Sequence, residues 1–285
     1  MNVKQVTETI LHKACGDFRL QLTCDLLMHG DWENEVTGVA STFIVTPEVI
    51  QKAAAQNINL IITHEPTWFT GKDETDWCLA DPVYLAKKKL LDEKEMNVWR
   101  FHDHMHMGGG DLIYSGLIKE LGWEEYRSEE SLTMGDHDPF LKRLSGAMNK
   151  WLYILPETTV GLLAKDLKRK LGMNTMRLVG DPNLPVSRVG ILVGGGSLGL
   201  GVEHMPMLFM QNADVHVMLC GDITEWTLCS YVNDAAQMGF ARAMLVLGHE
   251  RTEEAGMKHL PRWIQKELGG LPISFIDACE PFQYI

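Results

Sequence analysis

The sequence lacks three features that would each point to a particular class of protein. It has no apolar stretch near the roughly 20 residues needed to span a bilayer, and Met1–Gln5 lacks the basic-then-apolar layout of a signal peptide. Basic residues are also few, because the chain has 26 Lys and Arg against 38 Asp and Glu and a formal net charge of −12. Broad nucleic-acid binding needs clustered basic residues. We therefore predict a cytoplasmic protein with no membrane segment, and we consider a nucleic-acid partner unfavoured.

Cysteine is scarce and dispersed. The chain has six cysteines in 285 residues and no C-x-x-C pair, which argues against a disulfide framework or a compact zinc module. We expect buried, reduced thiols that behave as small apolar side chains. Nucleophilic catalysis has little support, because there is no G-x-S-x-G motif and no cysteine beside a strand-end histidine.

The glycine-rich segment Gly194–Gly201 also lacks what a nucleotide site would need. It has no Lys-Ser/Thr pair of a P-loop, and its glycine spacing fits a dinucleotide fingerprint poorly. We interpret it as a tight strand-to-helix turn, and a phosphate cradle remains the alternative.

The first third of the chain alternates strand and helix patterns. Apolar, β-branched runs predict strands, and Thr46-Pro47 and Asp81-Pro82 are strong helix starts. The order β-α-β-α-β favours a mostly parallel sheet covered by helices. The predicted strands are Gly38–Ile44, Asn59–Thr63 and Asn97–Phe101, and the predicted helices run from Thr46 to about Gln56 and from Asp81 to Leu91.

A second set of elements begins near Trp151. The predicted helices are Thr158–Leu171, Val202–Asn212, Trp226–Met238 and Glu253–Leu268, and the predicted strands are Met176–Val179, Arg188–Val193, Val215–Leu219, Ala243–Leu247 and Ile273–Asp277. We predict an α/β protein of two layered halves with mostly parallel or mixed sheets, residues 1–128 and 129–285. The irregular stretch Tyr126–Lys150 is the expected join.

Three apolar runs end in a histidine with a carboxylate beside it. His64 and Glu65 follow Asn59–Ile62, a second group follows Met96–Phe101, and a third follows Ala243–Leu247. Imidazole and carboxylate suit divalent first-row metals, and in open α/β sheets chemistry gathers beyond the carboxyl ends of strands. The pattern predicts a metal site at strand ends between the halves. The second and third groups are His102, Asp103, His104 and His106, and His249, Glu250 and Glu253.

Two of the groups also have an ordinary interpretation. His64 and Glu65 could be a capped strand end packed by Pro66. His249 and Glu253 are four apart, which places both on one face of a helix, yet alone they resemble a surface pair. His102, His104 and His106 point one way on an extended segment, whereas in a helix only His102 and His106 do.

Several other polar and aromatic residues leave alternatives open. Asp222 and Glu225 could support a ligand or cap a helix, and the acidic loop of Asp73, Glu74 and Asp76 is expected to be a solvated face. Four tryptophans fall near the polar clusters and could line a pocket, although Trp99 favours the core: Trp68, Trp77, Trp99 and Trp226.

Together these segments resemble the NIF-three family, also labelled GTP cyclohydrolase I type 2-like, whose members are dinuclear-metal proteins. The resemblance rests on Val45–Ile50 before Thr63-His64-Glu65-Pro66, on His102–His106, and on Gly248-His249 with Glu253. The segment order and spacing match over most of the chain. The resemblance implies two α/β domains and a toroidal hexamer.

Carried over position by position, the resemblance implies metal ligands at His64, Glu65, His106, His249 and Glu253, with His102 as a further ligand or a close neighbour of the site. Two of these depart from the family pattern. Glu65 stands where a second histidine is usual, and His106 where an aspartate is usual. One imidazole and one carboxylate have therefore exchanged places.

The leading hypothesis is a metal-dependent hydrolase that acts on a small molecule with two divalent ions such as Zn, Fe or Mn. Asp103 and His104 are the candidates for proton transfer, because both adjoin proposed ligands. The alternative is a metal-binding scaffold or regulatory oligomer without turnover. A third hypothesis is a structural α/β oligomer whose histidines are ordinary polar residues of a pocket.

Overall fold

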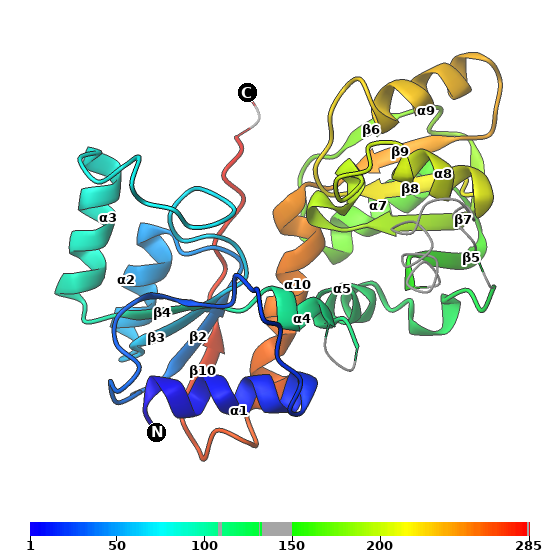
Figure 1. The fold of residues 1–285 in the computed structure, drawn as a ribbon. Helices are drawn as coiled ribbons and strands as arrows, with labels where there is room; N and C mark the ends of the chain where they lie inside the picture. The colour runs from blue at the N-terminus through cyan, green and yellow to red at the C-terminus, as the bar shows by residue number, and fades with distance from the viewer. Residues whose placement is uncertain (108–109, 131, 133–149, 284) are drawn as a thin grey trace. The chain divides into compact units, whose positions relative to one another are not determined.

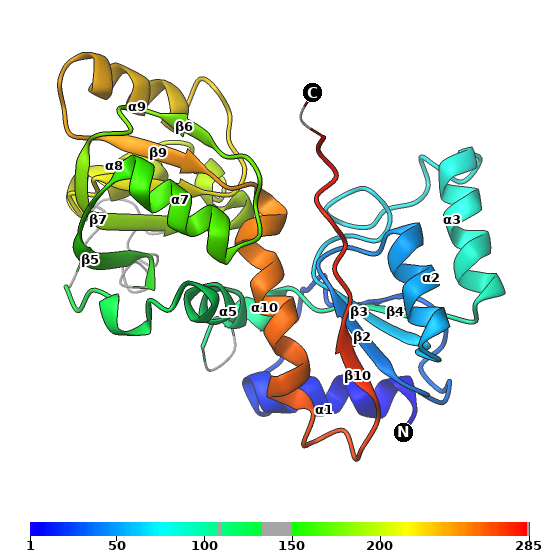
Figure 2. The same cartoon turned by 180° about the vertical axis from the view of Figure 1, so that it is seen from behind.

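The computed structural model describes residues 1–107, 110–130, 132, 150–283 and 285, and Figures 1 and 2 show it from opposite sides. The chain forms two compact units. The first is Met1–Gly116 with Glu254–Pro281, and the second is Leu117–Glu253 with Phe282–Ile285. Each unit contains a five-stranded sheet and helices, which confirms the predicted α/β class. Most of the expected join, Tyr126–Lys150, lies outside the described residues.

The sheet of the first unit has the order β1-β4-β3-β2-β10. Its last four strands are parallel, and only β1 runs antiparallel to its neighbour. Thr63 pairs with Arg100 where β3 and β4 end, so the residues that follow these strands emerge side by side. The strands are β1 (Leu27–His29), β2 (Val39–Thr42), β3 (Leu60–Thr63), β4 (Asn97–Arg100) and β10 (Ile273–Phe275).

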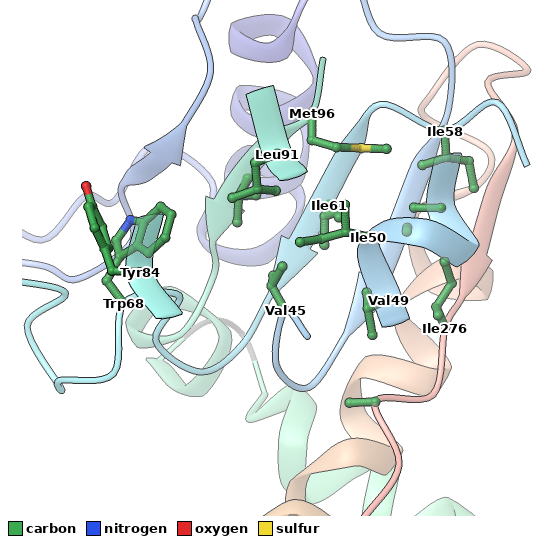
Figure 3. Packing of buried hydrophobic residues seen from close by; sticks show 14 of the residues in the cluster. Val45, Val49, Ile50, Ile58, Ile61, Trp68, Tyr84, Leu91, Met96 and Ile276 are labelled. Atoms are coloured by element: carbon green, nitrogen blue, oxygen red, sulfur yellow. The ribbon is translucent and has the colours of Figure 1, made fainter. Parts of the chain in front are cut away.

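Helices α2 (Pro47–Ala55) and α3 (Pro82–Glu93) cover one face of this sheet (Figure 1). Each begins as predicted, because the side chains of Thr46 and Asp81 accept backbone N–H groups of the first turn. Val49 and Ile50 of α2 pack over Ile61 of β3 (Figure 3). This apolar layer holds the carboxyl ends of β2, β3 and β4 in place.

The opposite face of the sheet is covered by α1 (Val3–Cys15) and by the part of α10 (His249–Ile264) that belongs to the first unit. The Ser41 hydroxyl on β2 donates to the Met257 carbonyl oxygen. On α5 (Leu112–Leu121), Gly116 lies so close to Gly256 that an added Cβ would be 2.5 Å from the Gly256 Cα. Glycine at this position therefore permits close backbone packing.

The sheet of the second unit has the order β5-β7-β8-β9-β6. Strands β7, β8 and β9 are parallel, whereas β5 and β6 pair antiparallel at the edges. Helix α7 lies in front of the sheet in Figure 2 and α8 lies behind it. The elements are β5 (Leu152–Thr159), α7 (Val160–Lys170), β6 (Arg177–Val179), β7 (Pro185–Leu192), α8 (Met205–Asn212), β8 (Val217–Cys220), α9 (Leu228–Gln237) and β9 (Ala243–Val246).

Several boundaries differ from the sequence predictions. The helix expected from Thr158 begins at Val160, because Thr158 and Thr159 extend β5 and pair with β7. The helix expected from Glu253 to Leu268 spans His249–Ile264, and it starts directly after Gly248 with its φ of 100°. The structure also adds elements that the pattern did not predict: α1, β1, β5, α4 (Asp103–Met107), α5, η1 (Glu124–Tyr126) and η3 (Gly194–Leu198).

Cysteine burial was predicted only in part. All six cysteines are free, but only Cys78 and Cys220 are buried, and Cys279 is exposed. No helix within the described residues is both long enough and apolar enough to cross a bilayer.

Lys87 on α3 is a buried cation, and it gives a test of this packing. Its ammonium group donates to the Thr67 carbonyl oxygen at 2.7 Å, and burial lowers its pKa to about 8. The unfolded chain keeps this proton up to a pKa of about 10.4. Between these values the unfolded state binds more protons, so the free energy of unfolding should rise with pH, by at most about 1.4 kcal/mol per pH unit.

Lys87→Met should flatten this rise between pH 8 and pH 10 in urea unfolding experiments. The control is Lys88→Met, which removes a neighbouring lysine that is exposed and pairs with Asp92, and it should keep the wild-type slope. Equal slopes for wild type and Lys87→Met would contradict the burial of this charge.

Candidate metal centre

Three histidines of the first unit come together beyond the ends of β3 and β4. His64 directly follows β3, and His102 follows β4 by two residues. The short helix α4 then places His106 one turn from His102, which is the helical alternative considered from the sequence. Their ring centroids are 4.5 to 5.1 Å apart, and a nitrogen of each lies within 4.8 Å of the others. The arrangement is that of a candidate metal site.

The Nδ1 atom of each of these imidazoles faces a hydrogen-bond acceptor. For His64 it is the Phe101 carbonyl oxygen at 3.2 Å, for His102 the Asp103 carboxylate at 3.0 Å, and for His106 the Asp111 carboxylate at 3.1 Å. An acceptor at Nδ1 favours the tautomer with its proton there and its lone pair on Nε2. Carboxylates and carbonyls hold metal-binding histidines in this way.

Glu65 adds a carboxylate to this cluster. Its Oε1 lies 3.8 Å from His102 Nε2, and its Oε2 lies 3.6 Å from the Arg100 guanidinium. With metal–ligand bonds of about 2.0–2.2 Å, one ion can contact two atoms separated by 3.8 Å. Glu65 Oε1 and His102 Nε2 are therefore close enough to bind the same ion.

Asp25 organises the start of α4 from a distant part of the sequence. Its carboxylate, only 1% exposed, accepts the backbone N–H groups of His102, Asp103 and His104. It also faces His104 Nδ1 at 2.7 Å, while His104 Nε2 accepts the Leu20 N–H at 3.1 Å. Both ring nitrogens of His104 are thus bonded inside the unit, and these bonds orient the helix that follows His102 and carries His106.

Asp103 is held as an anion. The hydrogen bond with His102 is the largest cause that keeps the pKa of Asp103 well below its usual range, and the Cys24 N–H and Thr23 hydroxyl add to it against the effect of burial. The neighbouring Cys24 shows the opposite effect, because burial raises the pKa of its thiol to about 12. The ionised Asp103 carboxylate therefore holds the His102 ring through Nδ1. The Cys24 thiol stays protonated at neutral pH when no metal ion is bound.

Asp73 was expected on a solvated face, and this prediction was wrong. Its side chain is 4% exposed and contacts the Arg100 guanidinium at 3.3 Å. It also accepts the Trp68 backbone N–H at 2.6 Å. The buried arginine explains the difference, since a buried guanidinium needs an anionic partner. The other two acidic residues of this loop, Glu74 and Asp76, are exposed as predicted.

The second unit holds a smaller histidine–carboxylate cluster at the start of α10. His249 Nδ1 lies 2.8 Å from the Asp222 carboxylate, and His249 Nε2 lies 3.0 Å from Glu253 Oε2. Asp222 therefore supports a candidate ligand, whereas Glu225 is exposed. The candidate pair His249 and Glu253 shares one helix face, as its spacing predicted.

The glycine-rich turn packs directly against this pair. A Cβ on Gly194 would lie 2.0 Å from Glu253 Oε1 and 2.6 Å from His249 Nε2, and the residue has a φ of 47°. The Gly194 N–H donates to the Thr252 hydroxyl at 2.9 Å. The sequence suggested a tight turn here, and the structure forms the 3-10 helix η3 over Gly194–Leu198. The close approach of Gly194 to the pair leaves no room for a Cβ unless those two side chains move.

The residues of both clusters fit a divalent metal. In the tautomer set by Asp222, the His249 Nε2 lone pair faces a carboxylate oxygen, a contact that a proton or a cation must bridge. In the first unit five carboxylates surround the imidazoles and one guanidinium: Asp25, Glu65, Asp73, Asp103 and Asp111. Asp25 and Asp73 are 1% and 4% exposed, and the other three are partly exposed. This excess of carboxylates over cations favours a bound cation.

Sequence reasoning missed Asp25, Asp111 and Arg100. Asp111 carried a usable signal, because it also caps α5 by accepting the Ile113 and Tyr114 N–H groups, and an aspartate before an apolar helix is a recognisable cap. Asp25 carried no such signal, since its bonds to α4 span 77 residues or more.

The comparisons with known proteins agree with this fold. A GTP cyclohydrolase 1 type 2 homolog of Clostridium perfringens (strain 13 / Type A) is 24% identical over 263 residues, covering 91% of this chain and 90% of the relative. A protein of the same name from Clostridium acetobutylicum is 23% identical over 228 residues, covering 80% of this chain and 76% of the relative.

Among solved structures, a Bacillus cereus protein related to NIF3 has a TM-score of 0.72 at 15% identity, with 100% of this chain and 99% of that chain covered. At this identity the likeness concerns the fold. The family model Duf34/NIF3 (NGG1p interacting factor 3) matches residues 1–281. Because that match covers nearly the whole chain and the fold agrees with it, the chain belongs to the Duf34/NIF3 family.

Proposed function

We propose that this protein binds divalent metal ions and uses them to hydrolyse a small molecule. The ligands are His64, Glu65, His102 and His106 in the first unit and His249 and Glu253 in the second. The observation that carries the proposal is the acceptor at Nδ1 of all four imidazoles, which directs each Nε2 lone pair outward as a metal ligand requires. Two ions per chain follow from the family resemblance.

The name of the two Clostridium relatives, GTP cyclohydrolase 1 type 2 homolog, supports hydrolysis as the reaction class. Their identities of 24% and 23% leave the substrate open, and the exchange of Glu65 and His106 relative to the family pattern also weighs against assuming GTP. The proposed substrate is therefore a small molecule with a bond that water can cleave.

When bound, the ions would supply a water nucleophile at neutral pH and polarise a carbonyl or phosphoryl oxygen of the substrate. The carboxylates of the protein orient the imidazole rings and keep the proton of each ring on Nδ1. Asp103 and Asp111 accept from the Nδ1–H groups of His102 and His106, which makes the opposite nitrogens better donors to a cation. Because both His104 nitrogens are bonded, we assign His104 to positioning α4 in place of proton transfer.

Metal content is the first test. Protein purified without an affinity tag should carry about two equivalents of Zn, Fe, Mn or a similar ion per chain by elemental analysis. His64→Ala/His106→Ala and His249→Ala should each lower this content. The matched control is His29→Ala, which removes a histidine that pairs with Asp92 outside both clusters. A wild-type chain that stays empty after metal is offered would refute the proposal.

The second test concerns Asp111. Asp111→Asn should weaken metal binding by about 10–100-fold, because His106 loses a charged acceptor while its ring remains. The dissociation constant is measured by competition with a chromophoric chelator. Asp92→Asn is the control, since it removes the same charge from His29 and should leave the constant unchanged. Equal constants for Asp111→Asn and wild type would show that Asp111 does not support a ligand.

Turnover is the third test. Metal-loaded protein should hydrolyse at least one member of a panel of esters, phosphoesters, amides and nucleotides, and His249→Ala should abolish this activity. Sedimentation analysis of the same variant tells whether the oligomer, a hexamer by resemblance, survives. Stoichiometric metal with no hydrolysis on any panel would reject the enzyme and favour the metal-binding scaffold or regulator.

A further inference from the structure

Arg100 is a buried cation beside the candidate metal site of the first unit. It is the last residue of β4, and its side chain is 4% exposed. Its Nε donates to the His64 carbonyl oxygen at 3.2 Å, and Nη1 donates to the Gly71 carbonyl oxygen at 2.7 Å. These bonds fix the guanidinium to the backbone at His64 and Gly71.

The charge of Arg100 is balanced on one side by Asp73. That carboxylate is itself held by the Trp68 N–H, so it anchors the guanidinium at Nη1 at 3.3 Å. Nη2 is thereby directed toward Glu65 Oε2 at 3.6 Å. Because this separation exceeds a normal hydrogen bond, the guanidinium acts on Glu65 mainly through its field.

The two carboxylate oxygens of Glu65 face different partners, and the positive charge of Arg100 favours this orientation. Oε2 lies on the Arg100 side, and Oε1 lies on the His102 side, 3.8 Å from Nε2. The Glu65 side chain is 14% exposed, so solvent screens this interaction only weakly. One guanidinium thus faces two carboxylates, and the Oε1 side of Glu65 is left directed at His102.

We infer that Arg100, anchored by Asp73, is a positioning residue that holds Glu65 as a carboxylate ligand at the place where the family pattern has a histidine. This inference rests on the proposed metal binding. An imidazole at position 65 is neutral and needs no guanidinium beside it. The arginine–aspartate pair is therefore matched to the carboxylate, and replacing that carboxylate removes the contact of Arg100 with position 65 while its bonds to the His64 and Gly71 carbonyl oxygens remain.

The experiment is a double-variant cycle between position 65 and the pair. Arg100→Met/Asp73→Asn removes the two charges together, so neither is left buried alone. It is made in the wild-type chain and in Glu65→His. The measurements are the Zn²⁺ dissociation constant by chelator competition, the visible absorption of the Co²⁺-loaded protein, and thermal unfolding of each variant without metal.

In the wild-type background the pair of changes should weaken Zn²⁺ binding about tenfold or more and alter the Co²⁺ spectrum. In the Glu65→His background the same changes should weaken Zn²⁺ binding less than in the wild-type background, because the only contact of Arg100 with the candidate metal site that is then lost is its bond to the His64 carbonyl oxygen. The matched control is Lys88→Met/Asp92→Asn, which removes an exposed pair of the same charges and should change neither measurement.

Each outcome decides one question. Equal weakening in both backgrounds, in step with thermal unfolding, would make Arg100 a structural residue and overturn the inference. Unchanged binding in the wild-type background would overturn it as well. A wild-type chain that binds no Zn²⁺ or Co²⁺ would instead refute the proposed function on which the inference rests.

Discussion

The parallel pairing of β3 with β4 is the constraint on which the first-unit cluster depends. The register that places Thr63 opposite Arg100 brings both strands to an end at one edge of the sheet. His64 and Glu65 therefore leave the sheet beside Phe101 and His102, although nearly forty residues separate them in the sequence. A shift of one residue would turn these side chains to the other face. The apolar layer beneath α2 and α3 (Figure 3) opposes such a shift.

A second organising feature is the supply of acceptors around the imidazoles. Asp103, Asp111 and Asp222 each face the Nδ1 atom of one imidazole. Asp25 accepts the backbone N–H groups at the start of α4. These carboxylates do not need to contact a metal to matter. They decide which nitrogen carries the proton and which way each ring points, and these are the properties on which ligand strength depends. The two units use the same device in different sequence contexts.

The sequence was informative where an interaction is local or periodic. Apolar runs predicted β2, β3, β4 and β9, and proline-capped starts predicted α2 and α3. The spacing of His249 and Glu253 predicted their common helix face. Helix α1 was missed although its signal was present, because Asn2 and Gln5 form a capping box ahead of an amphipathic stretch.

Other parts could not be read from a single sequence. The burial of Asp73 depends on Arg100, 27 residues away, and the role of Asp25 depends on a helix 77 residues away. No local pattern marks an acidic residue that will be buried by a distant partner, since exposed acidic loops look the same. The family resemblance likewise pointed to ligands but not to the carboxylates and the guanidinium that orient them.

The turn at Gly194 shows that a position without a side chain can be as restricted as a ligand. The volume that a methyl group would occupy there already belongs to Glu253 Oε1 and His249 Nε2. Any side chain at this position would displace these atoms, so the identity of residue 194 is constrained by two groups that it does not itself provide. The space left free at Gly194 is thus the space that the Glu253 carboxylate and the His249 imidazole occupy.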